Sequence, residues 1–77
     1  MSASQELEKN ATNYALEAVR LDKQGSRGMA ITMYQKSIES LLQLVRLYPE
    51  YDLNKVYVYS QRTRQLSNMH NQHFSFS

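Results

Sequence analysis

Gly25 and Pro49 divide this 77-residue chain into three runs, and each run carries apolar residues at steps of three or four. That spacing places apolar side chains on one face of an α-helix. Gly25 follows the last periodic residue of the first run, where a left-handed C-terminal cap favours glycine, and Ser26 is placed to cap the next helix. Proline lacks an N–H donor, so Pro49 ends the second helix. The sequence therefore predicts an all-α fold.

The three runs predict helices over residues 4–24, 27–48 and 52–68. Two apolar stripes lie side by side on the second helix, so it has to be covered from two directions. One partner helix cannot do this. We therefore expect a three-helix, up-down-up bundle over residues 1–69, with residues 70–77 as a flexible tail or the start of a linker.

The start of the third run, KVYVYS, alternates β-branched and aromatic residues in the manner of a strand. A lone strand would have no partner in this chain, because the other two runs are helical. Val56, Tyr59, Thr63 and Leu66 fall on one face at helical spacing. We therefore expect a helix here, with Tyr59 at the centre of its buried face.

Composition excludes several classes of function. The chain has no cysteine, which rules out disulfides and thiolate metal sites. No apolar run approaches the roughly 20 residues that span a bilayer, and the start, MSASQELEKN, lacks the basic-then-apolar order of a signal peptide. A chain this short buries too little surface for a deep enzymatic cavity. We therefore expect a soluble, cytoplasmic, non-catalytic domain without a cofactor.

His70 and His73 have a spacing that could bring two imidazoles to one metal ion. No cysteine or carboxylate joins them, so we expect no metal site.

The C-terminal third of the chain is basic: no acidic residue follows Asp52, whereas Lys55, Arg62 and Arg64 do. A basic C-terminal third allows an alternative function in binding nucleic acid or an anionic membrane. Three scattered cations fall short of the dense patch such modules carry, so we expect no nucleic-acid partner.

The stretch around Ala30, Tyr34 and Ser37 is similar to the second half of a tetratricopeptide repeat, which has the same small, aromatic, small pattern. In that repeat the second helix ends soon after the last small residue, whereas here it continues through LLQLVRLY to Pro49. No second copy follows at a period of about 34 residues, and a single repeat has no neighbour on which to bury its face. The length of the second helix therefore excludes a solenoid.

A second resemblance covers nearly the whole chain. The sequence resembles the microtubule-interacting and transport (MIT) domain, a three-helix bundle with a long middle helix. The first two helices carry most of the likeness, in Ala15, Ala18, Val19, Asp22, Gly25, Ala30, Ile31, Tyr34, Ser37, Ile38 and Glu39. The third helix adds Tyr59, Arg62 and Leu66. The opening MSAS and the LVRLYPE ending of the second helix look like those of archaeal members, which stand at the N-terminus of cell-division AAA ATPases.

This resemblance implies an adaptor domain that binds C-terminal tail motifs of ESCRT-III-like filament proteins. Such a domain recruits its host, an AAA ATPase, in membrane remodelling, protein transport or cell division. A host that is not an ATPase stays an alternative. The resemblance also implies that the domain reaches membranes only through the filament, and that it joins an oligomer through a host ATPase. Family members bind helical motifs between helices two and three, and extended, proline-containing motifs between helices one and three.

Helical phase, with Tyr59 at the centre, divides the third helix into two flanks, and the resemblance implies which flank borders which groove. The groove between helices one and three is predicted to be lined by Ala15, Val19, Val58, Arg62, Gln65 and Met69. Small Ala15 leaves room for an extended backbone, and Arg62 is placed to hold an acidic or carbonyl group at the rim. Apolar residues at helical spacing usually belong to the core. The alternative interpretation, that Ala15 and Val19 are ordinary core residues, therefore stays open.

The groove between helices two and three is the less favoured site. Its predicted lining is Met33, Leu44, Tyr57, Ser60 and Arg64. Ser60 stands where the family often has a leucine that fills the groove, and Arg64 where it often has an acid that pairs with an arginine of the incoming motif. An arginine facing an arginine costs affinity. The sequence therefore favours the groove between helices one and three.

Overall fold

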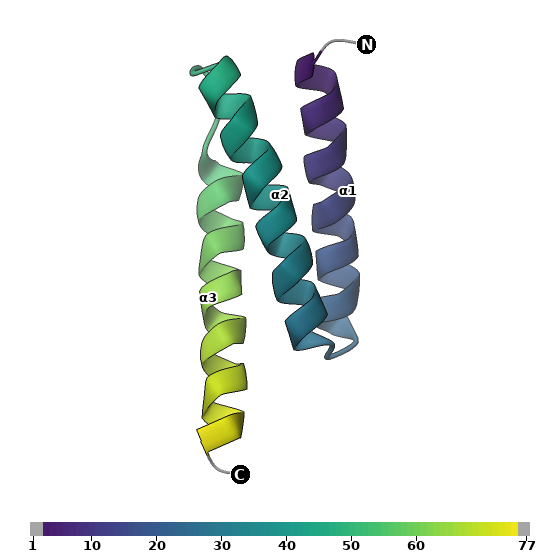
Figure 1. Ribbon diagram of the computed structural model, residues 1–77, viewed down its shortest axis with the longest axis vertical. Coiled ribbons are helices and arrows are strands. Elements are labelled where there is room, and N and C mark those ends of the chain that lie inside the picture. Colours follow the sequence, from purple (N-terminus) through teal and green to yellow (C-terminus); the bar gives the residue numbers. More distant parts are fainter. Residues whose placement is uncertain (1–2, 76–77) are drawn as a thin grey trace.

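The computed structural model describes the backbone of residues 3–75 and the side chains of residues 3–69. Over this part of the chain it contains three helices and no strand: α1 (Ala3–Lys23), α2 (Arg27–Leu47) and α3 (Asn54–Ser75). Figure 1 shows that α1 runs down, α2 returns beside it and α3 runs down again on the other side of α2. The predicted all-α, up-down-up arrangement is confirmed, and KVYVYS is helical.

The turn between α1 and α2 is a Schellman motif. The N–H of Ser26 donates to the carbonyl of Leu21 at 2.9 Å, and the N–H of Gly25 to that of Asp22 at 3.0 Å. Gly25 has φ of 83°, a left-handed conformation that costs glycine little. This confirms the predicted C-terminal cap. Ser26 occupies the N-cap position of α2, but its side chain makes no capping hydrogen bond.

The connection from α2 to α3 spans residues 48–53. α2 ends at Leu47, two residues before Pro49, and the N–H of Tyr48 still donates to the carbonyl of Leu44 at 2.8 Å. Asp52 stabilises the start of α3, because its Oδ1 accepts a hydrogen bond of 3.0 Å from the backbone N–H of Asn54. A side-chain acceptor there satisfies a donor that has no partner within the helix.

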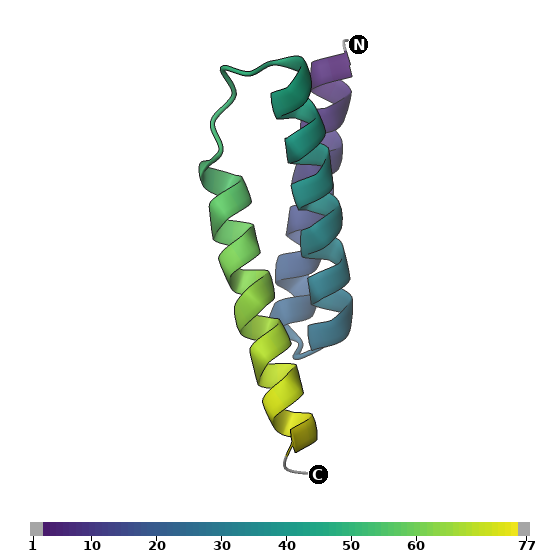
Figure 2. The ribbon, with the colours of Figure 1, turned by 60° about the vertical axis from the view of Figure 1, so that its left-hand side comes forward.

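α3 is longer than the sequence analysis predicted. Its expected end near residue 68 was wrong, since the helix continues to Ser75, and the predicted tail from residue 70 is helical over 70–75. Residues 69–75, MHNQHFS, contain neither glycine nor proline, so no residue there stops a helix that has already formed. Figure 2 shows the end of α3 projecting beyond the α1–α2 turn. Residues 76 and 77 lie outside the described part.

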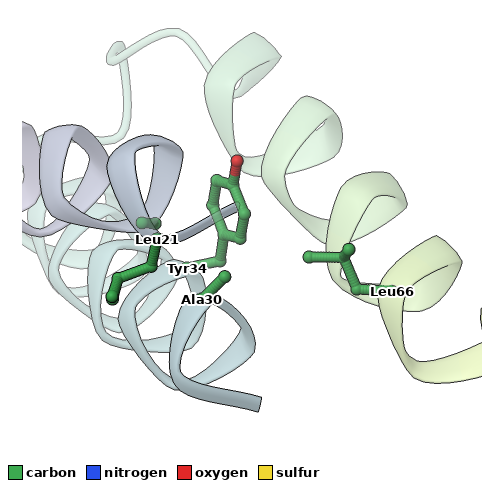
Figure 3. Packing of buried hydrophobic residues seen from close by; sticks show 5 residues of the cluster. Leu21, Ala30, Tyr34 and Leu66 are labelled. Atoms are coloured by element: carbon green, nitrogen blue, oxygen red, sulfur yellow. The ribbon is translucent and has the colours of Figure 1, made fainter. Parts of the chain in front are cut away.

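Small residues bring α1 and α2 close together. Ala18 of α1 and Ala30 of α2 are both fully buried and belong to the same core cluster. Leu21 and Tyr34 extend this cluster, and Leu66 joins it from α3, as Figure 3 shows. Leu66 is the only α3 side chain among those described that is buried to this degree. Tyr59 also packs against this cluster, with its ring centroid 5.7 Å from that of Tyr34, so Leu66 is the most deeply buried of the side chains that attach α3.

α2 is the central helix, because it packs against both of the others. By contrast, among the described residues no Cα atom of α1 lies within 8 Å of a Cα atom of α3. The two outer helices are thus bridged by side chains and not by close backbone packing. None of the helices, over the part of the chain described, combines the length and hydropathy that a bilayer-spanning segment needs.

Candidate functional site: the groove between α1 and α3

A cavity of about 470 Å³ lies between α1 and α3, above a floor supplied by α2. One face of α1 forms its longest wall, with the residues Glu8, Ala11, Thr12, Ala15, Leu16 and Val19. The floor comes from Ser37 and Leu41 of α2. The opposite wall is formed by the α2–α3 connection and the first two turns of α3, with Tyr51, Asp52, Lys55 and Tyr59. We call this cavity the α1/α3 groove.

Three of the four buried side chains at the bottom of the groove are small. They are Ala11 and Ala15 at the base of the α1 wall and Ser37 in the floor, and the fourth is Leu41. The Ser37 hydroxyl donates to the carbonyl oxygen of Ala11 at 2.8 Å. This bond satisfies the hydroxyl inside the α1–α2 contact, so the floor presents no unsatisfied polar side-chain atom. Because alanine and serine carry so little bulk, an incoming backbone can lie close to the axis of α1.

The rim on the α1 side is apolar and open to solvent. Leu16 is 65% exposed and Val19 is 37% exposed, one turn apart beside the buried alanines. Large apolar side chains that line a concavity and remain in water are typical of a surface that binds another molecule. The alternative that Val19 is an ordinary core residue is therefore disfavoured, whereas Ala15 is both buried and part of the lining.

A three-helix polar network lies beyond the end of the groove nearest the α1–α2 turn, and none of its residues belongs to the lining. Arg62 of α3 reaches Asp22 of α1 with two hydrogen bonds of 2.6 Å, from Nε to Oδ2 and from Nη2 to Oδ1. The hydroxyl of Tyr34 of α2 also donates to Oδ2, at 3.0 Å. A bidentate pair of this kind fixes geometry as well as charge. It sets the separation of α1 and α3 at this level.

These contacts change the ionisation of all three groups. Hydrogen bonding to Arg62 is the main reason that the pKa of Asp22 lies below its ordinary value, although burial opposes the shift. The same bond raises the pKa of Arg62. Burial, followed by the hydrogen bond to Asp22, raises the pKa of Tyr34 to about 12. At neutral pH the network thus holds a carboxylate, a guanidinium and a neutral phenol.

Tyr51, in the α2–α3 connection, and Glu8, on α1, line the groove toward its other end. Hydrogen bonding to the Glu8 carboxylate is the main cause that raises the pKa of Tyr51 above its ordinary value.

The predicted residues of this groove divide into two sets. Ala15 and Val19 line it, as the sequence analysis proposed. Four residues of α3 are not part of the lining: Val58, Arg62, Gln65 and Met69. Arg62 does face α1, as predicted from helical phase, but its guanidinium is held by Asp22 and by Gln65, whose Oε1 accepts from Nη1 at 3.3 Å. Val58 and Met69 are exposed on α3.

None of the residues predicted for the groove between α2 and α3 lines the α1/α3 groove. Leu44 is fully buried and offers no free surface, whereas Met33 is half-buried and packs against the core cluster. Tyr57 and Arg64 are exposed, and Ser60 is half-buried. Arg64 lines a shallow depression formed by α3 alone. The site with walls from two helices is the one next to α1.

Several lining residues escaped the sequence analysis. On α1 they are Glu8, Ala11, Thr12 and Leu16. Glu8, Thr12 and Leu16 follow one another at steps of four, beside Ala11 and Ala15. That ladder was visible in the sequence as the next row of the helix. Tyr51 and Lys55 left no comparable signal, because their position depends on the path of the α2–α3 connection.

In the described part of the chain, no group of three or more His, Asp or Glu side chains is arranged to hold a metal ion. The side chains of His70 and His73, which were weighed as a pair of ligands, lie outside the described residues.

Comparison with known proteins gives a partial match. No protein-family model matches the chain. Over 57 residues it is 47% identical to Cell division protein C of Sulfolobus acidocaldarius. The match covers 74% of this chain and 15% of that protein, so the chain corresponds to a small part of its relative. The chain is therefore similar to a segment of an archaeal cell-division protein.

Proposed function

We propose that this chain is a binding domain that takes up a tail segment of an ESCRT-III-like filament protein in the α1/α3 groove. The observation that carries the proposal is the groove itself, which has an apolar wall, mostly small side chains at its bottom and a volume of about 470 Å³. The resemblance to MIT domains supports the class of partner. The proposal assigns binding, and no reaction, to these residues.

The wider role follows from the relative. Because the similar protein is named for cell division and is several times longer than the matching segment, we propose that this domain serves a larger host in cell division. The host is proposed to be an AAA ATPase, which the domain delivers to a filament. A small groove gives affinities of about micromolar or weaker, and repeated binding along a polymer compensates for this.

Phosphate binding has less support. It would depend on Lys55, Arg62 and Arg64, and Arg62 is already paired with Asp22. Within the described part this leaves two of those three cations for phosphates, which is fewer than such modules use. Lys55 and Arg64 alone thus give phosphate binding less support than the groove gives to peptide binding.

The experiment is titration of the isolated chain with a proline-containing C-terminal tail peptide of an ESCRT-III-like protein, followed by backbone amide NMR shifts. We expect saturable shifts in α1, in the connection and at the start of α3. Ala15→Asp is expected to abolish binding, and Leu16→Asp to weaken it by about tenfold or more, since the latter places a charge on an apolar rim. Leu16 is exposed, so its substitution leaves the core intact.

Leu47→Asp is the matched control, because Leu47 is 58% exposed on α2 and does not line the groove. It is expected to bind the peptide like the unaltered chain. Shifts confined to the outer face of α2 and α3, or equal losses in Leu16→Asp and Leu47→Asp, would show that the groove is not the binding site.

A further inference from the structure

The usable length of the α1/α3 groove is bounded by the Asp22–Arg62 pair and by Glu8. Arg62 joins α3 to α1 at Asp22, and Glu8 is the lining residue of α1 farthest from that pair. Glu8 and Asp22 are fourteen residues apart on α1, which at 1.5 Å per residue is about 21 Å. An extended chain advances by about 3.3 Å per residue. The stretch between these two positions therefore accommodates about six residues of extended backbone.

The charge of the groove is opposite in sign to that of the whole chain. The chain carries a formal net charge of +2, whereas the lining holds two carboxylates, Glu8 and Asp52, against the single ammonium of Lys55. All three charged groups lie toward the Tyr51 end. At the other end Asp22 and Arg62 neutralise each other. The excess negative charge is thus confined to one end.

The two carboxylates differ in how free they are. Both oxygens of Asp52 accept hydrogen bonds from Asn54, at 3.0 Å from the backbone N–H and 3.1 Å from the side-chain amide. Glu8 lines the groove together with Tyr51 and is exposed, and a carboxylate accepts several hydrogen bonds at once. The ring of Tyr51 also lines the groove, and an aromatic face attracts a cation. Glu8 is therefore the group best placed to pair with a basic side chain.

From these observations we infer that the occupant is an extended, apolar segment of about six residues with a lysine or arginine at the end that lies against Glu8. This inference rests on the proposed function and specifies the chemistry of the partner. A segment with an acidic residue at that end would face Glu8 and be rejected by repulsion. Glu8 is thus a specificity-determining residue, whereas Ala15 and Leu16 supply the contact area.

The test uses synthetic peptides with a six-residue core of alternating valine and proline. One lysine, or one glutamate in its place, is added at the N-terminal end in one pair of peptides and at the C-terminal end in another. Affinities for the 77-residue chain are measured by isothermal titration calorimetry. At one of the two ends, the lysine peptide is expected to bind about fivefold to tenfold more tightly than its glutamate counterpart.

Glu8→Gln keeps the size and an acceptor oxygen of the side chain but removes the charge, and is expected to reduce this preference to about twofold or less. Glu8→Lys is expected to reverse it. Glu6→Gln is the control, because Glu6 is exposed on α1 and does not line the groove; it should keep the preference. A core of four residues is expected to bind more weakly than one of six, and a core of nine no more tightly.

The outcomes separate the inference from the proposed function. If the filament tail peptide binds and Leu16→Asp prevents it, but the lysine and glutamate peptides bind equally or not at all, the inference is overturned and the proposed function stands. If neither the tail peptide nor any synthetic peptide binds, the proposed function falls as well. Sedimentation of the chain alone gives a third result: a dimer that dissociates when peptide is added would make a second copy the occupant and overturn the inference.

Discussion

Asp22 contacts both other helices through its one carboxylate. It accepts two hydrogen bonds from Arg62 and one from Tyr34, and its side chain is 13% exposed. The sequence analysis placed Asp22 at the end of the first helix and turned Arg62 toward that helix, both correctly. It did not pair them, because helical phase gives the direction of a side chain but not its level along the bundle, and the two residues are forty positions apart.

Replacing Asp22 tests the strength of this junction. Asp22→Asn is expected to lower the free energy of unfolding by about 1 kcal/mol, since bonds to charged groups contribute somewhat more than that when buried. The 39% exposure of Arg62 reduces the value through solvent screening. Urea unfolding at neutral pH, followed by circular dichroism, measures the change. An unchanged unfolding midpoint would show that the network contributes specificity and no stability.

The same variant carries a pH signature. Since the folded chain has a lowered Asp22 pKa, the stabilisation is complete above the ordinary aspartate pKa of about 3.9 and is lost as the pH falls through the lowered folded value. The difference between Asp22→Asn and the unaltered chain should therefore shrink below about pH 4. Glu17→Gln is the control. The Glu17–Arg20 pair is about half exposed, so its removal is expected to leave the unfolding midpoint unchanged.

At the scale of elements, the sequence was sufficient for the three helices and the glycine turn, and insufficient for the outer wall of the groove. Apolar spacing and capping residues are local signals, and they placed α1 and α2 to within one residue. The rotation of α3 was inferred from a bundle in which it closes over both neighbours. In the structure the described backbone of α3 comes close to α2 but not to α1, which it meets through side chains. Lys55 and Tyr59 face the groove in place of Val58 and Met69.

The attachment of α3 depends on Leu66, which is 1% exposed. Leu66→Ala is expected to cost about 2–5 kcal/mol, from lost burial and the cavity left behind. α3 should be destabilised more than the α1–α2 hairpin. Amide hydrogen exchange is therefore expected to show that the amides of α3 lose protection, while those of the α1–α2 hairpin keep more of theirs. Val58→Ala removes a side chain that is 59% exposed on the same helix, and is expected to change stability little. Equal loss of protection in all three helices would mean that they unfold as one unit.

At the scale of the whole molecule, the chain is elongated. Its radius of gyration is 13.7 Å, whereas a compact domain of this length has about 11.5 Å. The principal extents are 48, 20 and 13 Å. A long, narrow shape with an open groove on one side buries a limited core, so the free energy of unfolding is expected to be toward the low end for single domains.

A domain of low stability should respond strongly to its ligand. Saturating the groove with tail peptide, at about 100 times its dissociation constant, adds about 2.7 kcal/mol to the free energy of unfolding. For a chain of this size, that raises the melting temperature by about 10–20 °C. Differential scanning calorimetry with and without peptide measures the shift. The Leu16→Asp variant should show almost none; an equal shift in that variant would place the peptide elsewhere.

The up-down-up path also decides how the domain responds to tension. Figure 1 shows the two ends of the described chain at opposite ends of the long axis, with α1 and α3 pointing the same way. A pull between these ends acts along the helices, so the α1–α2 and α2–α3 contacts are sheared and must slide together before the fold yields. A path with both ends on one side would let the same force peel contacts apart one turn at a time. The arrangement therefore suits a domain that has to stay folded while its two ends are drawn in opposite directions.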